Sequence, residues 1–295
     1  MRVAVVGAGA IGAVLARAAA PSGDVQLCVR TPIPSLTIVD PDGSESRLAV
    51  SVLTSPSSAS PVDVVFLTVK ATDTATAAPW LSALCSPSTL VVAVQNGLDH
   101  AARVGPFMPA GVTVVPGLAY IAAERLSAGR VRYLAGGLLV VPASVSDVVA
   151  SALAGLKVRG ADDMVTASWQ KLLGNLVANP ITALTMRRID VMSSPGIPDL
   201  ARGLLEEAVA VGRASGASFD PSVVDAIVAG TAQYGPETGS SMLYDRLAGR
   251  HMEHQYLTGE VVRRGSALGI PVPLNAALLA LLEAIDRALP GTTSM

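Results

Sequence analysis

Three polar side chains recur at a helical interval in the second half of the chain. Lys171, Asn175 and Asn179 stand at i, i+4 and i+8, so on a helix they share one face, within an arc of about 80°. The residues between them are mostly apolar, namely Leu172, Leu173, Leu176, Val177 and Ala178. This pattern predicts a buried helix whose polar row lines a space enclosed by protein. The alternative is an ordinary solvated helix face.

The residue types in this row are rare elsewhere in the chain. The sequence contains three lysines, Lys70, Lys157 and Lys171, and four asparagines, Asn96, Asn175, Asn179 and Asn275. An ammonium group can give up a proton, and amides can bind a hydroxyl or a carboxylate without adding charge. A lysine kept away from water has a lowered pKa, which makes it a usable general acid near neutral pH. Arginine does not release its proton and could not take this role.

The N-terminus carries a pattern typical of dinucleotide binding. The β-branched run Arg2–Val6 predicts a strand, a helical pattern begins at Ala13, and a G-x-G-x-x-G sequence joins them. In this context the first glycine allows the tight turn, the second allows a pyrophosphate to approach, and the third allows the helix to pack on the strand. The expected contacts are Gly7, Ala8, Gly9, Ala10, Ile11 and Gly12. The alternative is a glycine-rich turn without a ligand.

Polar residues follow the next predicted strands. Arg30 comes directly after the apolar run Val25–Val29, where a cation accommodates the 2′-phosphate of NADP and a carboxylate would favour NAD. The alternative is that Arg30 is an ordinary surface arginine without a ligand. Lys70 and Asn96 follow later buried strands, and the carboxyl ends of parallel strands face the ligand crevice. The sequence therefore predicts NADP as cofactor, with Lys70 and Asn96 beside the nicotinamide ribose or the substrate.

Composition limits the classes of function. A chain of 295 residues with 51% hydrophobic and 15% charged residues is a folded, soluble protein of two domains, and its net charge of −2 offers no basic face for nucleic acid. No apolar run is long enough to cross a membrane, and the N-terminus only loosely imitates a secretory signal. The three histidines form no metal-ligand pattern with Cys28 and Cys85. Free thiols in a cytoplasmic protein are the simpler interpretation, although a single disulfide remains open.

The secondary-structure pattern changes at about residue 162. Residues 1–162 alternate strands and helices, typical of a doubly wound Rossmann-type domain of the α/β class. Residues 163–295 predict an all-α substrate domain. The helices expected there are Val165–Thr185, Asp199–Ser215, Pro221–Ala232, Met252–Leu268 and Leu274–Leu289. In the turn-rich stretch 234–241, Ser240 and Ser241 are expected to cap a short helix or to face the cleft.

The chain resembles the ketopantoate reductase (2-dehydropantoate 2-reductase) family over nearly its full length. Five pieces carry the resemblance: the glycine motif, Val69–Lys70, Gln95–Gly97, the Lys171/Asn175/Asn179 row with Pro180, and Ser240–Asp245 followed by Glu253-x-x-Tyr256-x-x-Gly259. The resemblance implies a two-domain plan like that of 6-phosphogluconate dehydrogenase. It also implies NADPH-dependent reduction of a 2-oxo acid to a 2-hydroxy acid in pantothenate biosynthesis.

The family's residue roles then follow by position. Lys171 would be the general acid, and Glu253 would lie near the ribose of the cofactor. The substrate would contact Lys70, Asn96, Lys171, Asn175, Asn179 and Ser241, while Lys70, Asn96 and the backbone at Ala123 would line the nicotinamide side and Arg30 would hold the 2′-phosphate. The chain departs from the usual pattern at Ile189–Asp190, Met252 and Gln255, which leaves the identity of the 2-oxo acid open.

Other interpretations remain. The same plan could serve another 2-oxo acid, an imine or a β-hydroxy acid. Two alternatives belong to other classes of protein: a sensor that binds NADPH without turnover, and a protein whose helical half mainly dimerises. The chain is expected to be a monomer or a homodimer. A sensor would have no use for the proton donor that Lys171 provides.

Overall fold

The computed structural model describes residues 1–231, 235 and 238–289. The chain folds into two compact units, one made of residues 1–95 and 99–164 and the other of 96–98 and 165–295. The short segment Asn96–Leu98 therefore leaves the first unit and joins the core of the second. Part of the turn-rich stretch 234–241 lies outside the described residues.

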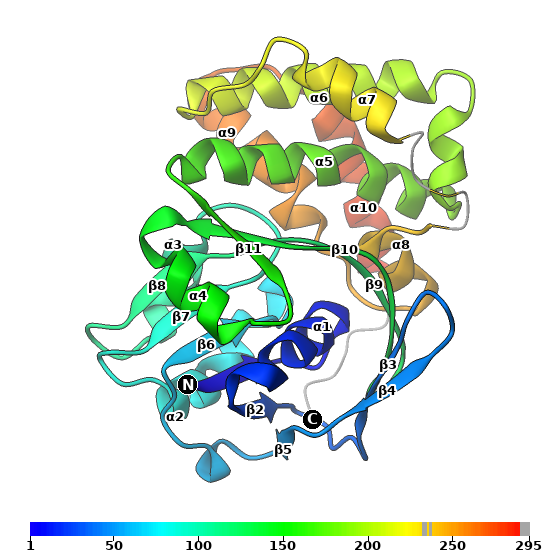
Figure 1. The fold of residues 1–295 in the computed structure, drawn as a ribbon. Coiled ribbons are helices and arrows are strands. Elements are labelled where there is room, and N and C mark those ends of the chain that lie inside the picture. Colours follow the sequence, from blue (N-terminus) through cyan, green and yellow to red (C-terminus); the bar gives the residue numbers. More distant parts are fainter. Residues whose placement is uncertain (232–234, 236–237, 290–295) are drawn as a thin grey trace. The chain divides into compact units, whose positions relative to one another are not determined.

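A six-stranded, fully parallel sheet forms the centre of the first unit (Figure 1). Its strand order is β5-β2-β1-β6-β7-β8, so the chain starts in the middle and winds out both ways. The strands are β1 (Arg2–Val6), β2 (Asp24–Cys28), β5 (Ser51–Leu53), β6 (Val64–Leu67), β7 (Leu90–Ala93) and β8 (Thr113–Pro116). This topology confirms the predicted Rossmann-type fold class.

Both faces of this sheet are covered, as the continuous apolar runs require. Along β1, Val3 and Val5 pack into one buried cluster with helix α1 (Ala10–Ala19), and Ala4 and Val6 pack into another with α2 (Ala78–Leu84). Shorter helical elements connect the strands: η1 (Ala20–Ser22), η2 (Pro56–Ser58), η3 (Ala71–Ala77), α3 (His100–Val104), η4 (Gly105–Phe107), η5 (Ala143–Val145) and α4 (Ser146–Ala152).

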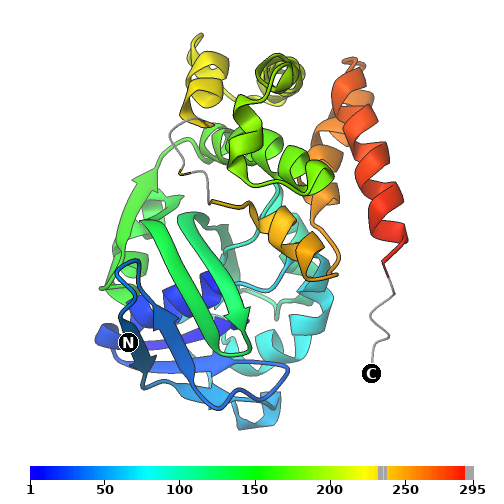
Figure 2. The ribbon, with the colours of Figure 1, turned by 90° about the vertical axis from the view of Figure 1, so that its right-hand side faces the viewer.

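A second, mixed sheet also packs against α1, because residues of both sheets share one apolar cluster with that helix. Its strands are β3 (Leu36–Val39), β4 (Glu45–Leu48), β9 (Leu118–Ser127), β10 (Arg130–Pro142) and β11 (Lys157–Ala161). Figure 2 shows β9 and β10 as two long neighbouring strands. Strand β10 runs unbroken over 13 residues. Gly136 and Gly137, at φ +93° and +131°, accommodate register shifts in it.

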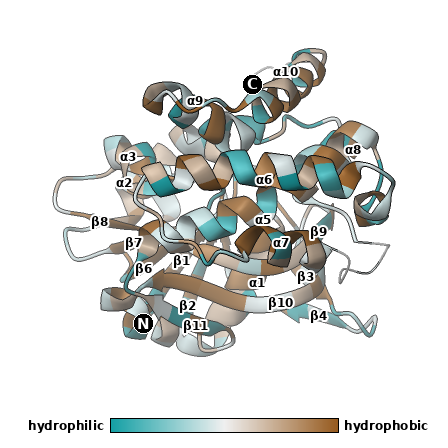
Figure 3. Ribbon diagram, turned by 90° about the horizontal axis from the view of Figure 1, so that it is seen from above, coloured by the Kyte–Doolittle hydropathy of each residue, from teal (hydrophilic) through white to brown (hydrophobic). Residues whose placement is uncertain are grey.

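The second unit is helical. Its elements are α5 (Met164–Thr185), η6 (Ile189–Ser193), α6 (Ile197–Ala214), α7 (Val223–Thr231), α8 (Ser241–Leu247), η7 (His254–Tyr256), α9 (Thr258–Leu268) and α10 (Pro273–Arg287). Polar and apolar residues alternate along α6 in Figure 3, and its apolar positions join the same buried cluster as Trp169 and Leu172 of α5. This amphipathic pattern is why the helices were predictable.

One predicted helix begins later than its apolar pattern indicated. The helix expected from Met252 starts at Thr258, and the residues before it form an extended segment and the single turn η7. Met252 is buried in the core of the unit, so its hydrophobicity reflects packing of a loop. In the described parts of the chain, none of the helices combines the length and apolar character needed to span a membrane.

Candidate active site

The glycine-rich turn between β1 and α1 has the geometry that its sequence predicts. Gly7 has φ +108° and its N–H donates to the carbonyl of Cys28 at 2.9 Å. A Cβ at Gly12 would lie 1.9 Å from the Gly7 carbonyl oxygen, so only glycine lets the helix start this close to the strand. Both glycines are therefore required by the local backbone.

Gly9 is different, because none of the described residues would clash with a side chain at this position. It is the N-cap residue of α1, the helix carries no side-chain cap there, and a Cβ at Gly9 would meet no protein atom within 4 Å. A helix N-terminus that is open in this way suits an anionic ligand, since backbone N–H groups and the helix dipole both favour negative charge. The turn thus fits the pyrophosphate of a dinucleotide.

Two polar residues that the sequence reasoning did not assign hold this edge of the sheet together. The Thr68 hydroxyl lies 2.8 Å from the Gly7 carbonyl oxygen and 3.0 Å from that of Val6. Buried Gln95 donates from Nε2 to the Val69 carbonyl at 3.0 Å, and its Oε1 accepts from Arg103 Nε at 3.1 Å. Their position directly after buried strands was the only signal in the sequence.

The other cofactor candidates of the first unit occupy separate places. Lys70 follows Val69 and is the N-cap residue of η3. Arg30 is exposed just beyond the end of β2. Ala123 lies within β9, paired with Tyr133, and packs against the same apolar cluster as Ala8, Ala10 and Ile11. The structure connects the glycine turn to β6 through Thr68, but it shows no comparable link for Arg30.

In the second unit, Lys171 lies near the start of α5, where Trp169, Leu172 and Leu173 are buried. The residue has intermediate exposure, and desolvation of its ammonium group lowers the pKa from 10.5 to about 8. At neutral pH the group is still mainly protonated, but it is a far better proton donor than a lysine in water. This is the property expected of a general acid.

Asn96, Asn175 and Glu253 come together from three distant parts of the sequence. Asn96 Nδ2 donates to Glu253 Oε2 at 3.0 Å, and Asn96 Oδ1 accepts from Asn175 Nδ2 at 3.2 Å. Asn175 lies one helical turn after Lys171 on α5. A carboxylate, two amides and an ammonium thus occupy neighbouring positions within one unit.

Asn179 and Ser241 form a second group further along α5. Asn179 Oδ1 accepts from the Ser241 hydroxyl at 2.9 Å and from the Met242 N–H at 3.1 Å, and its Nδ2 donates to the Asn175 carbonyl at 3.1 Å. The Asn179 oxygen is therefore occupied by protein donors, and mainly its second N–H is left for a ligand.

The start of α8 is fixed from the same helix. The Ser240 side chain accepts from the Leu243 N–H at 3.1 Å, which confirms the predicted cap. Its hydroxyl also lies 2.7 Å from that of Thr182, a fully buried residue of α5. Thr182 is another residue that the sequence reasoning missed, because a threonine in a helix carries no distinctive signal.

Neither the acids nor the thiols of the described residues suggest metal or disulfide chemistry. The described part of the chain contains no group of three or more His, Cys, Asp or Glu side chains that could hold a metal ion. Cys28 and Cys85 are free and buried, and burial raises the pKa of their thiols to about 12 and about 11. Both thiols are therefore unreactive at neutral pH.

Comparison with known proteins agrees with this geometry. The family model described as "Ketopantoate reductase PanE/ApbA" matches residues 3–145, and its C-terminal counterpart matches residues 163–286. A 2-dehydropantoate 2-reductase of Caulobacter vibrioides is 38% identical over 289 residues, which cover 96% of this chain and 98% of the relative.

Solved structures show the same fold. A PanE/ApbA family ketopantoate reductase from Ralstonia eutropha superimposes with a TM-score of 0.87 at 32% identity, covering 97% of this chain and 99% of that one. A D-mandelate dehydrogenase solved with NADH and anilino(oxo)acetate shares the fold at 20% identity, with a TM-score of 0.86 and coverage of 98% and 99%. The relatives' names support an oxidoreductase that acts on ketopantoate, and the family implies a nicotinamide cofactor. The chain belongs to the ketopantoate reductase family.

Proposed function

We propose that this protein catalyses the NADPH-dependent reduction of 2-dehydropantoate to pantoate, a step of pantothenate biosynthesis, with Lys171 as general acid. Residues 1–162 would bind the cofactor and residues 163–295 would bind the substrate. The observation that carries the proposal is Lys171, whose pKa of about 8 is combined with amides at one-turn intervals on α5. Two buried free thiols support a reducing compartment, and we place the enzyme in the cytoplasm.

Bound NADPH would supply a hydride to the carbonyl carbon of the substrate. Negative charge then builds on the carbonyl oxygen, and the Lys171 ammonium stabilises it and transfers a proton from Nζ to it. Desolvation favours the neutral amine that is left, because the same burial lowers the pKa of the group. The lysine regains its proton from water before the next turnover.

The amides and the hydroxyl would orient the substrate. Asn175 Nδ2 uses one N–H on Asn96 and keeps a second donor for a hydroxyl or carboxylate. The Ser241 hydroxyl donates to Asn179, so its oxygen is left to accept from a substrate hydroxyl. Glu253, fixed by Asn96, would accept from a hydroxyl of the cofactor ribose.

In the first unit, the open N-terminus of α1 at Gly9 supports binding of the pyrophosphate. Arg30 is exposed after β2, and an arginine there would provide a bidentate donor for a 2′-phosphate. Lys70, beside the nicotinamide ribose or the substrate, would add a second positive charge. These features together favour NADPH over NADH.

A different 2-oxo acid is the second candidate, because the chain departs from the family pattern at three positions. Ile189 and Met252 are 6% and 2% exposed and belong to the apolar core of the second unit, and Gln255 donates to Glu283 on α10. These side chains are therefore used in packing or in internal hydrogen bonds. The departures at these positions therefore give little reason to propose a substrate other than ketopantoate.

The test is to follow oxidation of NADPH by the purified protein with ketopantoate and with a panel of other 2-oxo acids, and to repeat the series with NADH. Selective turnover of ketopantoate with NADPH is expected. Turnover of another 2-oxo acid at a higher kcat/KM would refute the substrate. Tight NADPH binding without turnover of any member of the panel would favour a sensor instead.

A further inference from the structure

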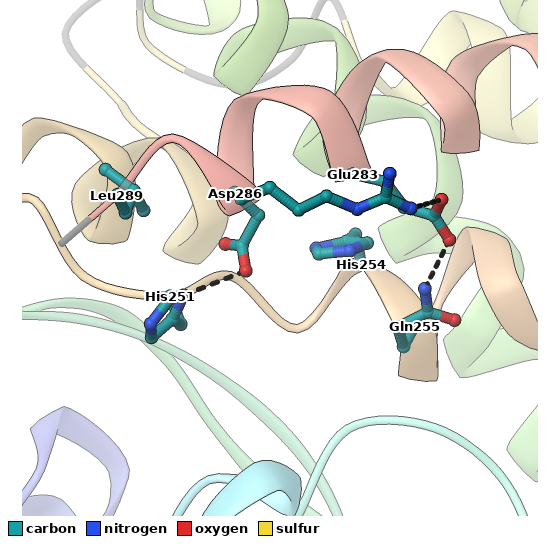
Figure 4. Close-up of a pocket in the computed structure, with 7 residues that line it drawn as sticks. His251, His254, Gln255, Glu283, Asp286 and Leu289 are labelled. Carbon is teal, nitrogen blue, oxygen red and sulfur yellow. Dashed lines mark hydrogen bonds and ion pairs between the residues drawn. The ribbon is translucent and has the colours of Figure 1, made fainter. Parts of the chain in front are cut away.

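The segment that carries Glu253 is tied to helix α10 on its N-terminal side. Asp286 accepts from the Met252 N–H through Oδ1 at 2.8 Å and from His251 Nδ1 through Oδ2 at 2.9 Å. Figure 4 shows His251 and Asp286 facing each other across a pocket of the second unit. One carboxylate thus holds the two residues that come directly before Glu253.

A second carboxylate of α10 holds the other side. Glu283 Oε1 accepts from Gln255 Nε2 at 2.6 Å, and Figure 4 shows this contact in the same pocket. Glu283 and Asp286 are three residues apart on the helix, so both point from one face. Their side chains are 29% and 18% exposed, which shields these charge-assisted hydrogen bonds from much of the solvent.

This attachment bears on the site because Glu253 has no regular helix to hold it. It precedes the single turn η7 and lies five residues before α9, and it makes no side-chain cap. Its carboxylate accepts from Asn96, whose oxygen in turn accepts from Asn175. A shift of the Glu253 backbone would therefore disturb its hydrogen bond to Asn96 and, through Asn96, the contact with Asn175.

We propose that Asp286 and Glu283 are positioning residues for Glu253: they fix residues 251–255 on α10 and so set the orientation of the Asn96 and Asn175 amides. In this proposal neither acid binds the substrate. The catalytic consequence rests on the proposed function of Glu253, whereas the attachment itself does not.

The experiment compares variants by amide hydrogen exchange and by steady-state kinetics of the full-length protein. Asp286→Ala removes both acceptors, and Asp286→Asn keeps a carbonyl oxygen for the Met252 N–H. For Glu283 the reciprocal variant Gln255→Glu with Glu283→Gln exchanges donor and acceptor and keeps the hydrogen bond. Asp225→Ala is the matched control, because it removes an exposed acid from another helix of the same unit, where it pairs with Arg202.

In Asp286→Ala we expect exchange in residues 251–257 to become at least about tenfold faster, and kcat/KM to fall about tenfold, as for loss of one charge-assisted hydrogen bond. Asp286→Asn should recover part of the exchange protection and part of the kcat/KM that Asp286→Ala loses. Gln255→Glu alone should lose activity, because two carboxylates would then face each other in place of the hydrogen bond. The reciprocal double variant should regain it, and the control should match the wild type.

Unchanged exchange in 251–257 for Asp286→Ala would overturn the proposal. Faster exchange throughout the second unit would overturn it as well, because Asp286 would then support the helix bundle in general. If Asp286→Ala does not fold, failure of the reciprocal variant to recover the exchange protection that Gln255→Glu loses would still refute the idea. A wild type that does not reduce ketopantoate would refute the proposed function, while the exchange comparison would still decide the attachment.

Discussion

Replacement of Lys171 by arginine keeps the positive charge of the side chain but removes its ability to donate a proton. Arginine keeps a cation at the site, so binding of an anionic substrate is retained, but its pKa above about 12 prevents proton transfer. General acid catalysis contributes about 10²–10⁴ in rate. We therefore expect kcat of Lys171→Arg to fall by about that factor while KM changes only about threefold. Lys157→Arg, the same change at an exposed lysine of the first unit, should have no effect.

The pH profile carries the second half of this prediction. Because desolvation lowers the pKa of Lys171 to about 8, the protonated fraction falls about tenfold for each pH unit above that value. In the wild type, kcat/KM for reduction should fall accordingly on the alkaline side, because this ratio reports ionisation of the free enzyme. This limb should be absent from the residual activity of Lys171→Arg. The assay is NADPH oxidation at several ketopantoate concentrations across pH 6 to 10, read with the control variant. Near-normal kcat in Lys171→Arg, or the same alkaline limb in that variant, would refute the assignment.

Further predictions test the elements around this lysine. Gly12→Ala should lower the free energy of unfolding by about 1–3 kcal/mol, since its Cβ would overlap the neighbouring turn. Gly9→Ala should keep the wild-type Tm but lose affinity for NADPH, as measured by calorimetry. Arg30→Ala should raise KM for NADPH far more than KM for NADH. Equal changes in the two KM values would count against binding of the 2′-phosphate by Arg30. Thr182→Val should cost about 1–2 kcal/mol in urea unfolding, because it removes the partner of a buried hydroxyl. Asn179→Ala should raise KM more than it lowers kcat.

The sequence predicted the parts of the fold in which each element has its own periodicity. The apolar runs Arg2–Val6 and Leu90–Ala93 are strands because both faces of the sheet are buried, and α5 was visible from its apolar positions. The second sheet was only partly predictable, since β9 is a long antiparallel partner of β10 without strong alternation. Pairing between distant strands is a property of the fold that local pattern does not contain.

The relative placement of the candidate residues was predictable where spacing on one element was enough, and not where the chain folds back on itself. The row Lys171, Asn175 and Asn179 follows from one helix. The hydrogen bond between Asn96 and Glu253 joins residues 157 positions apart, and nothing in the sequence indicates it without the family resemblance. Thr182 and Asp286 were missed for a related reason, because their importance lies in which donors they meet.

The contacts of α5 divide its polar row into two functional parts, although the row looks uniform in sequence. Asn175 donates one N–H to Asn96, whereas the oxygen of Asn179 accepts from Ser241 and Met242 at the start of α8. An acceptor that already has two donors cannot bind a third without losing one. Asn179→Asp should therefore keep the acceptor for Ser241 and Met242. It removes the hydrogen bond to the Asn175 carbonyl and buries a charge, so the Tm should fall. Because the new carboxylate lacks the N–H and repels an anionic substrate, KM for ketopantoate should rise sharply. An unchanged KM would refute a role of the Asn179 N–H in substrate binding.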